Sequence, residues 1–307
     1  MSEENKRSIR ISVRNLVEFV LRSGDIDNRR SGNAQKDAML AGGRIHRKIQ
    51  KRMGSGYRAE VPLKHEVTDD EQEIVLSVEG RADGIFTENG ITVIDEIKGM
   101  YTDVARLEAP IEVHLAQAMC YGYFYCCDKD LDGIRLQLTY CNLETEEIRR
   151  FQTDRSKEEL EQWFSGVVHE YFKWAIYLYH HELTRDASIR NLEFPYPYRE
   201  GQRDLVVSVY RTISRKKRLF IQAPTGIGKT LSTVFPAVRA IGEGKGDKLF
   251  YLTAKTVTRT VAEEALRILR GKGLIFTSVT ITAKEKLCPL ENCECNPDAC
   301  PYACLLY

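Results

Sequence analysis

The sequence has no long apolar run and no excess of charge of either sign. No apolar stretch approaches the roughly 18–20 residues that a membrane-spanning helix requires, and the first twelve residues, MSEENKRSIRIS, contain no apolar signal core. The formal net charge is +1, so the overall charge indicates no nucleic-acid partner and any basic surface must be local. These absences predict a cytoplasmic protein without a membrane partner.

The composition is that of a folded chain. Hydrophobic residues make up 43% and charged residues 29% of the 307 residues, which is enough material for about two domains with buried cores. We find no internal repeat, and no low-complexity segment apart from a cysteine cluster near residue 300. In the cytoplasm thiols stay reduced, so that cluster favours metal binding or catalysis over disulfides.

Residues 1–190 have the pattern of a mixed α/β domain. Ser12 is placed to cap a helix over residues 13–22, and a basic helix is expected over 39–53. Residues 73–99 predict two strands joined by a Glu-Asn-Gly turn, which is typical of a tight hairpin. A buried helix (110–128), a second hairpin (134–142 with 146–154) and a long amphipathic helix (156–189) follow.

A second domain is expected to begin near residues 190–200, where NLEFPYPYREGQ contains two prolines and a glycine. From there, apolar segments predict strands over 218–223 and 248–254. Helices are predicted over 203–217, 231–244 and 256–273. This alternation predicts the start of a parallel α/β sheet over residues 191–286.

The segment APTGIGKT (223–230) follows a predicted strand and opens a predicted helix, as a phosphate-binding loop must. Gly226 and Gly228 let the backbone N–H groups point inward toward phosphates. Lys229 would reach the β- and γ-phosphates of ATP, and Thr230 would bind Mg²⁺. An accidental glycine turn is the alternative, and the flanking strand and helix argue against it. The predicted loop residues are Ala223, Pro224, Thr225, Gly226, Ile227, Gly228, Lys229 and Thr230.

Three segments, YREGQ, IQAPTGIGKT and YLTAKTVTRTVAEEAL, together resemble the start of a superfamily 2 helicase motor of the DinG/XPD iron–sulfur type. The resemblance covers roughly residues 195–307, with Ala223 in place of the usual first glycine of the loop. It implies a RecA-like P-loop motor, ATP-dependent 5′→3′ DNA unwinding and a role in DNA repair or processing. It also implies that Gln202 reads the adenine. Contacts to single-stranded DNA are implied for Thr253, Lys255 and Thr256.

The segment CPLENCECNPDACPYAC (288–304) holds five of the nine cysteines. Closely spaced thiolates suit an iron–sulfur cluster or zinc. The helicase resemblance implies a 4Fe-4S cluster, with residues 287–307 as the start of its domain. Zinc and unliganded reduced thiols remain alternatives. The expected ligands are Cys288, Cys293, Cys295 and Cys300, with Cys304 as a substitute for Cys293.

Such a motor also needs a later Asp-Glu pair and an arginine from a second motor domain. Residues 230–307 contain neither in a recognisable form. We therefore expect the chain to be a fragment of a longer helicase that cannot unwind DNA alone.

Carboxylates and a lysine are concentrated in GRADGIF (80–86) and VIDEIKG (93–99), on adjacent predicted strands. Strand alternation puts Glu96 and Lys98 on one face, and Asp83 can lie near Glu96 across the hairpin. Two carboxylates that hold Mg²⁺ or Mn²⁺, with a lysine that steadies developing charge, suit phosphodiester cleavage. The alternative for these residues is a surface salt bridge.

These residues resemble the core of a RecB-like PD-(D/E)XK nuclease, with Asp83 and Glu96-Ile97-Lys98 as its signature, over roughly residues 10–185. The resemblance implies that His46 is a further metal ligand and that Gln117 and Tyr121 contact DNA. It makes residues 1–190 a metal-dependent nuclease domain whose substrate is DNA that is single-stranded or has single-stranded tails. A stand-alone exonuclease and a non-catalytic DNA-binding platform remain alternatives.

Overall fold

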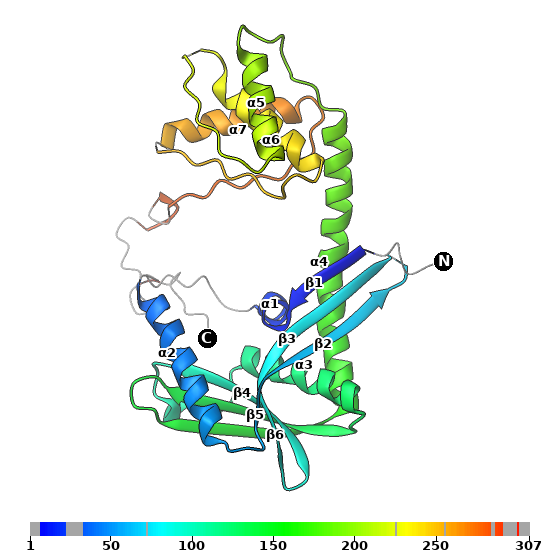
Figure 1. Cartoon of the computed structure of the whole chain (residues 1–307), viewed down its shortest axis with the longest axis vertical. Helices are drawn as coiled ribbons and strands as arrows, with labels where there is room; N and C mark the ends of the chain where they lie inside the picture. The colour runs from blue at the N-terminus through cyan, green and yellow to red at the C-terminus, as the bar shows by residue number, and fades with distance from the viewer. Residues whose placement is uncertain are drawn as a thin grey trace. The chain divides into compact units, whose positions relative to one another are not determined.

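The computed structural model describes residues 7–22, 33–71, 73–224, 226–254, 256–283, 286–290 and 300. The chain divides into two compact units (Figure 1). The first unit holds the described residues up to Trp174 and those from 286 onward, and the second unit is Ala175–Ala283. The division falls within helix α4 (Lys157–Arg190).

The first unit is built on a six-stranded mixed sheet with the order β1-β3-β4-β5-β6, in which β2 also pairs with β3. β1 lies parallel to β3 and β4 lies parallel to β5, while the other pairs are antiparallel. The strands are β1 (Arg7–Ser12), β2 (Arg58–Asp69), β3 (Ile74–Glu88), β4 (Ile91–Met100), β5 (Gly133–Asn142) and β6 (Ile148–Ser156).

Two helices cover opposite faces of this sheet (Figure 1). In α2 (Asn33–Arg52), Ile45 and Ile49 pack against Ile97 of β4 and Cys141 of β5. α3 (Glu112–Lys129) lies against the other face, where a Cβ on Gly122 would be 2.8 Å from a methyl of Leu136. Because strand side chains alternate between faces, these contacts place the two helices on opposite sides.

The hairpin and helix predictions for the first unit are confirmed. Asn89 and Gly90 both have left-handed φ, +51° and +80°, as a two-residue primed turn requires. Ser12 caps α1 (Val13–Val20), since its hydroxyl accepts a 3.1 Å hydrogen bond from the Asn15 N–H. A short 3-10 helix, η2, spans Val104–Arg106, and α2 begins six residues earlier than expected.

Two strands of the sheet, β1 and β2, are not among the sequence predictions. Both have alternating patterns, RSIRIS and RAEVPLKHEVTD, which are the available signal. Neither pattern says which strand is the partner, and β2 supplies a residue of the candidate site described below.

The second unit consists of the end of α4 and three further helices, α5 (Gln202–Ser214), α6 (Lys229–Gly242) and α7 (Thr256–Arg270). Its core combines residues from all of these helices and from the segments that connect them. Its buried members are Ile189, Leu192, Val206, Val234, Phe235, Val238, Ala265, Leu269 and Leu274.

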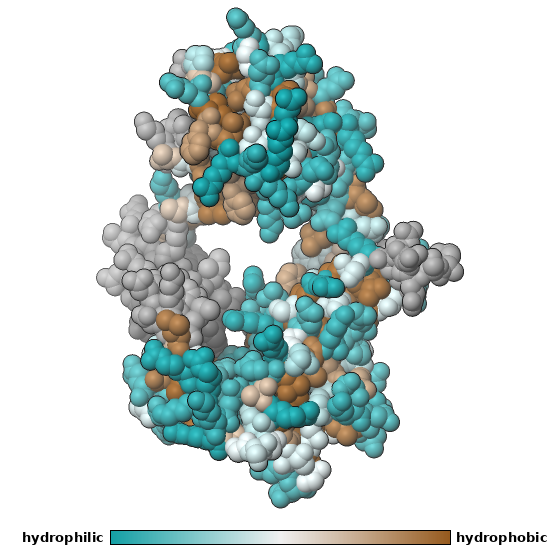
Figure 2. All heavy atoms as spheres, in the orientation of Figure 1, coloured by the Kyte–Doolittle hydropathy of each residue, from teal (hydrophilic) through white to brown (hydrophobic). Residues whose placement is uncertain are grey.

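The strands predicted over 218–223 and 248–254 are wrong, because no strand forms in the described part of the second unit. Phe220 is 93% exposed and Leu252 is 88% exposed. Figure 2 shows brown apolar side chains on the face of the second unit that is turned to the viewer. An apolar pattern makes a strand only where a neighbouring strand accepts its backbone hydrogen bonds. The predicted α/β class is therefore confirmed by the sheet and helices of the first unit, and the RecA-like fold of the second unit stays a prediction.

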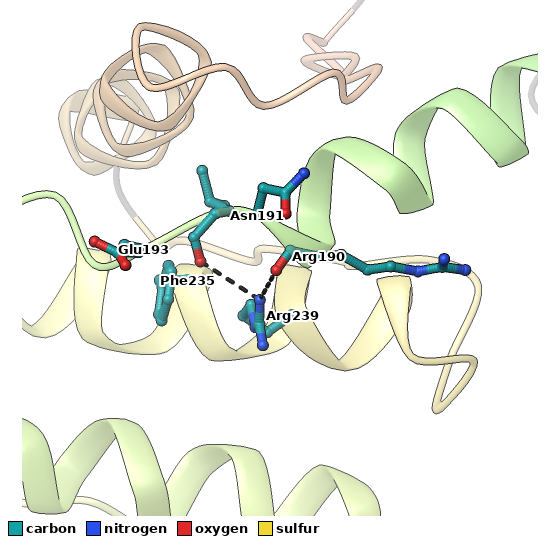
Figure 3. Close-up of a pocket in the computed structure, with 6 residues that line it drawn as sticks. Arg190, Asn191, Glu193, Phe235 and Arg239 are labelled. Atoms are coloured by element: carbon teal, nitrogen blue, oxygen red, sulfur yellow. Dashed lines mark hydrogen bonds between the residues drawn. The ribbon is translucent and has the colours of Figure 1, made fainter.

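Arg239 of α6 closes the C-terminal end of α4 (Figure 3). Its guanidinium donates hydrogen bonds to the carbonyl oxygens of Ile189 (2.9 Å), Arg190 (3.0 Å) and Leu192 (3.5 Å). The last carbonyls of a helix lack intrahelical partners, and a cation there also complements the helix dipole. An open pocket of about 520 Å³ lies beside Arg239 and is lined by it. The Arg239 guanidinium there already donates hydrogen bonds to backbone carbonyls.

We expect Arg239→Ala to lower the free energy of unfolding by about 1–2 kcal/mol, since it leaves helix-end carbonyls without a charged donor. Urea denaturation of the whole chain measures this change. Arg190→Ala is the matched control, because the Arg190 side chain is exposed and it is that residue's backbone that Arg239 binds. Equal stability of the two variants would refute the capping role.

A search of the helices in the described residues finds none with the length and apolar character needed to cross a membrane.

Candidate functional site

Asp83 and Glu96 meet where β3 and β4 diverge. β3 pairs with β1 from Ile74 as far as Glu79, and it pairs with β4 from Gly84 onward. Residues 80–83 therefore lie between the two pairings on that edge. The Asp83 carboxylate accepts a 2.7 Å hydrogen bond from the Ile97 N–H, which fixes it against β4 next to Glu96. The structure thus brings together the two carboxylates predicted from the sequence.

Lys98 lies beside this pair, two residues beyond Glu96 on the same face of β4. Its Nζ is 2.7 Å from Oε1 of Glu96 and donates a 2.7 Å hydrogen bond to Oε1 of Gln117 on α3. Gln117 is buried, so it holds the ammonium group in one orientation. The predicted lysine is therefore placed against the carboxylates rather than in solvent.

Glu96 is the most buried of the four charged or titratable side chains His46, Asp83, Glu96 and Lys98. Its side chain is 5% exposed, and its Oε2 has no hydrogen-bond partner among the described residues. Burial raises the pKa of Glu96 to about 7, against the lowering effect of Lys98. A buried carboxylate oxygen without a partner is costly. A divalent cation would satisfy it, and the oxygen and imidazole donors present suit Mg²⁺ or Mn²⁺.

His46 joins the carboxylates from α2, with Nδ1 3.4 Å from a carboxylate oxygen of Asp83. Burial alone would lower the pKa of His46, but the hydrogen bond and the charge of Asp83 outweigh burial and raise it. Gln50, one helical turn further on, donates a 3.0 Å hydrogen bond to the Asp83 carbonyl. The sequence prediction missed Gln50, although the i,i+4 spacing from His46 was available as a signal.

Gln117 and Tyr121 are both buried in the first unit. A Cβ on Gly80 would lie 2.6 Å from the Tyr121 hydroxyl, so this ring packs tightly on β3. In the structure Gln117 orients Lys98, and contact of either residue with DNA stays a prediction.

A second polar network lies on the opposite face of β4, around fully buried Asp95. The carboxylate accepts hydrogen bonds from Thr139 (2.6 Å), Gln137 (3.0 Å) and Tyr57 (3.0 Å). A Cβ on Gly84 would lie 1.8 Å from the Tyr57 ring, so only glycine leaves room for it. The sequence prediction missed this network, which links β4, β5 and Tyr57, the residue before β2.

The glycine loop opens helix α6 in the second unit. Gly226 and Gly228 have φ of +88° and +79°, in the left-handed region that favours glycine. Gly228 is the residue before the helix, and no side chain caps its first N–H groups. Such a helix start is suited to anions. Lys229 donates hydrogen bonds to the carbonyls of Ala223 (3.0 Å) and Pro224 (2.9 Å).

Gln202 holds this loop from α5. Its Nε2 donates a 2.9 Å hydrogen bond to the Ile227 carbonyl, and its Oε1 accepts a 3.0 Å hydrogen bond from the Arg199 N–H. Arg199 also donates a hydrogen bond to the Gly226 carbonyl. The structure therefore gives Gln202 a role in positioning the loop, and its contact with adenine stays a prediction. Thr225 lies outside the described residues.

The structure describes only some of the remaining predicted site residues. Thr230 lies 3.5 Å from the Tyr251 hydroxyl, and Thr253 is exposed. Lys255 and the Thr256 side chain lie outside the described residues. Cys300 is buried and Cys288 is half-buried, whereas Cys293, Cys295 and Cys304 lie outside the described residues. The iron–sulfur site therefore stays a prediction, and we derive no step through it.

Comparison with known proteins gives one short match. The chain is 45% identical over 47 residues to the probable ATP-dependent helicase MJ0942 of Methanocaldococcus jannaschii, a match that spans 15% of this chain and 7% of that protein. No protein-family model matches the chain. A solved structure described as the crystal structure of SSO0001 is 18% identical to this chain, with a TM-score of 0.35, over a match that covers 55% of this chain and 78% of the SSO0001 chain. The chain is thus similar to a helicase over one short segment.

The buried Glu96 makes stability depend on pH when no metal is present. Because its folded pKa of about 7 exceeds the ordinary value of 4.5, the folded state binds more protons between these values. We therefore expect the free energy of unfolding in EDTA to fall as pH rises through this window. The difference between wild type and Glu96→Gln isolates this contribution in urea titrations below and above the window. A difference that is constant across pH would contradict it.

Proposed function

We propose that the first unit is a divalent-metal-dependent DNA nuclease. The observation that supports this most is the juxtaposition of Asp83, Glu96 and Lys98, with one oxygen of buried Glu96 lacking a partner among the described residues. A structural salt bridge accounts for Lys98 and one oxygen of Glu96. It does not account for the second oxygen or for the approach of His46 to Asp83.

In this proposal Asp83, Glu96 and His46 hold Mg²⁺ or Mn²⁺. The bound cation supplies the polarisation of the scissile phosphate and the lowering of the pKa of an attacking water. Lys98 offers its ammonium protons to the water or to the charge that develops on phosphate oxygen, and Gln117 keeps that ammonium aimed. The Ile97 N–H holds the Asp83 carboxylate so that it does not rotate away.

The test is to incubate the whole chain with single-stranded DNA and Mn²⁺, with EDTA as the control. Cleavage that needs the metal supports the proposal, and no cleavage with either Mn²⁺ or Mg²⁺ rejects it. Salt-dependent DNA binding that survives Glu96→Ala, without cleavage, would instead indicate a non-catalytic binding platform.

A separate observation, the 47-residue similarity to a probable ATP-dependent helicase, favours the chain as part of such a helicase. We propose that the glycine loop binds ATP with Lys229 on the phosphates and Thr230 on Mg²⁺. The proposed whole activity is 5′→3′ DNA unwinding of the iron–sulfur type in DNA repair or processing. In it, the nuclease site acts on the DNA that the motor handles.

The 4Fe-4S cluster is tested by spectroscopy. Anaerobically purified protein should absorb at the blue end of the visible spectrum through sulfur-to-iron charge transfer, and a Cys288→Ser variant should lose that absorbance. Colourless protein with stoichiometric zinc would replace the cluster by a zinc site.

A further inference from the structure

Glu60 lies at the candidate site, although neither the sequence motifs nor the proposed ligand set includes it. A carboxylate oxygen of Glu60, a ring nitrogen of His46 and a carboxylate oxygen of Asp83 all lie within 4.8 Å of one another. The three residues come from β2, α2 and β3. One nitrogen and two oxygens at this separation form a donor set that suits Mn²⁺ or Mg²⁺.

The strand register carries Glu60 to this position. Ala59 pairs with Gly84 and Val61 pairs with Ala82, so Glu60 stands across from Asp83. Glu60 has a φ of +53°, the left-handed conformation that glutamate adopts rarely. Gln50 links the two residues, because its Nε2 lies 3.3 Å from a Glu60 carboxylate oxygen and 3.0 Å from the Asp83 carbonyl.

Among the described residues Glu60 forms no ion pair, whereas Lys98 is already paired with Glu96. Close by, the buried Oε2 of Glu96 has no hydrogen-bond partner in the described part of the chain, but Glu96 is not a member of the three-residue cluster.

We infer that Glu60, His46 and Asp83 form a divalent-cation position in which Glu60 is an additional protein ligand, and that this position binds the cation even without Glu96. The inference rests on the proposed nuclease function and adds a ligand to its metal site. Two carboxylates and one histidine then surround the cation. Water or a phosphate oxygen would complete the coordination shell, because Mg²⁺ and Mn²⁺ favour octahedral oxygen-rich coordination.

The test is a titration of the whole chain with Mn²⁺, in which the electron paramagnetic resonance signal of free Mn²⁺ reports how much is bound. We expect Glu60→Gln to weaken binding at least about tenfold, as losing even a supporting group of a metal site does. We expect Glu96→Gln to retain a bound Mn²⁺. Glu66→Gln is the matched control, since Glu66 is exposed on the same strand and pairs with Lys64, and it should bind as wild type does.

Wild-type affinity in Glu60→Gln, or loss of all binding in Glu96→Gln, would overturn the inference. The nuclease proposal would survive either result if metal-dependent cleavage still required Asp83. No Mn²⁺ binding by the wild-type chain would overturn both. If Glu60→Gln does not fold, Glu60→Gly is the second variant for the same test. Glycine accepts a φ of +53° without strain, so this variant should fold. Its melting temperature in EDTA should be at least that of wild type, and added Mn²⁺ should raise it less.

Discussion

The Lys98→Ala variant should lose about 10³-fold in the rate of Mn²⁺-dependent cleavage of single-stranded DNA, because it removes the one cation aimed at the developing charge. Lys98 is fixed by 2.7 Å contacts to Glu96 and Gln117, so no neighbouring side chain substitutes for it in the described site. The rate is measured on labelled DNA under single-turnover conditions, where chemistry and product release are separated.

The same variant should change how metal-free stability depends on pH. Lys98 lowers the pKa of Glu96, so its removal leaves Glu96 protonated to higher pH, and the fall in the free energy of unfolding in EDTA should move to higher pH. Lys64→Ala is the control, because Lys64 is an exposed lysine of β2 paired with Glu66. Undiminished cleavage by Lys98→Ala, with Lys64→Ala also unchanged, would remove Lys98 from the proposed chemistry.

The Lys229→Ala variant should bind ATP about 100-fold more weakly than wild type. Lys229 is the first residue of α6, and its Nζ hydrogen-bonds two loop carbonyls that phosphate oxygens would replace. Two hydrogen bonds from a charged donor, at about 1.5 kcal/mol each, correspond to about 3 kcal/mol and hence to about 100-fold in Kd. Titration of the whole chain with a fluorescent ATP analogue measures the change.

Lys245→Ala controls for general charge in this titration, since Lys245 is an exposed lysine just beyond α6. Without nucleotide, Lys245→Ala should melt as wild type does, and Lys229→Ala should melt slightly lower because it loses two hydrogen bonds from an exposed side chain. A Kd for Lys229→Ala equal to that of Lys245→Ala would contradict the assignment of the loop to ATP. The nuclease proposal would be unaffected, because its residues lie in the first unit.

Local signals in the sequence are sufficient for much of the first unit. Ser12 is predicted to be a cap and is one, and the Asn-Gly pair at 89–90 forms the expected turn. Each of these features depends on a few neighbouring residues, as does the spacing of Glu96 and Lys98 on one face of a strand. The candidate residues Asp83, Glu96 and Lys98 therefore follow from local patterns in the sequence, whereas His46 is predicted only through the family resemblance.

Long-range pairing is outside the reach of such signals. The pairing of β2 with β3 brings Glu60 to His46 and Asp83, and no local pattern marks a lone glutamate at the start of a strand. The Asp95 network likewise depends on residues 38–44 positions away in the chain. Sequence alternation assigns Asp95 to the other face correctly, but does not identify its partners.

What the sequence determined by itself is therefore the local chemistry: the caps, the turn, the glycine loop and the face on which Glu96 and Lys98 lie. What only the tertiary structure decided is which of these groups meet. It set Glu60 and Gln50 beside the predicted carboxylates, buried Gln117 and Gln202 as positioning residues, and left residues 218–223 and 248–254 without strand partners. The physical reason is that backbone pairing and desolvation depend on neighbours distant in the chain, whereas periodicity and capping depend on neighbours within one or two turns.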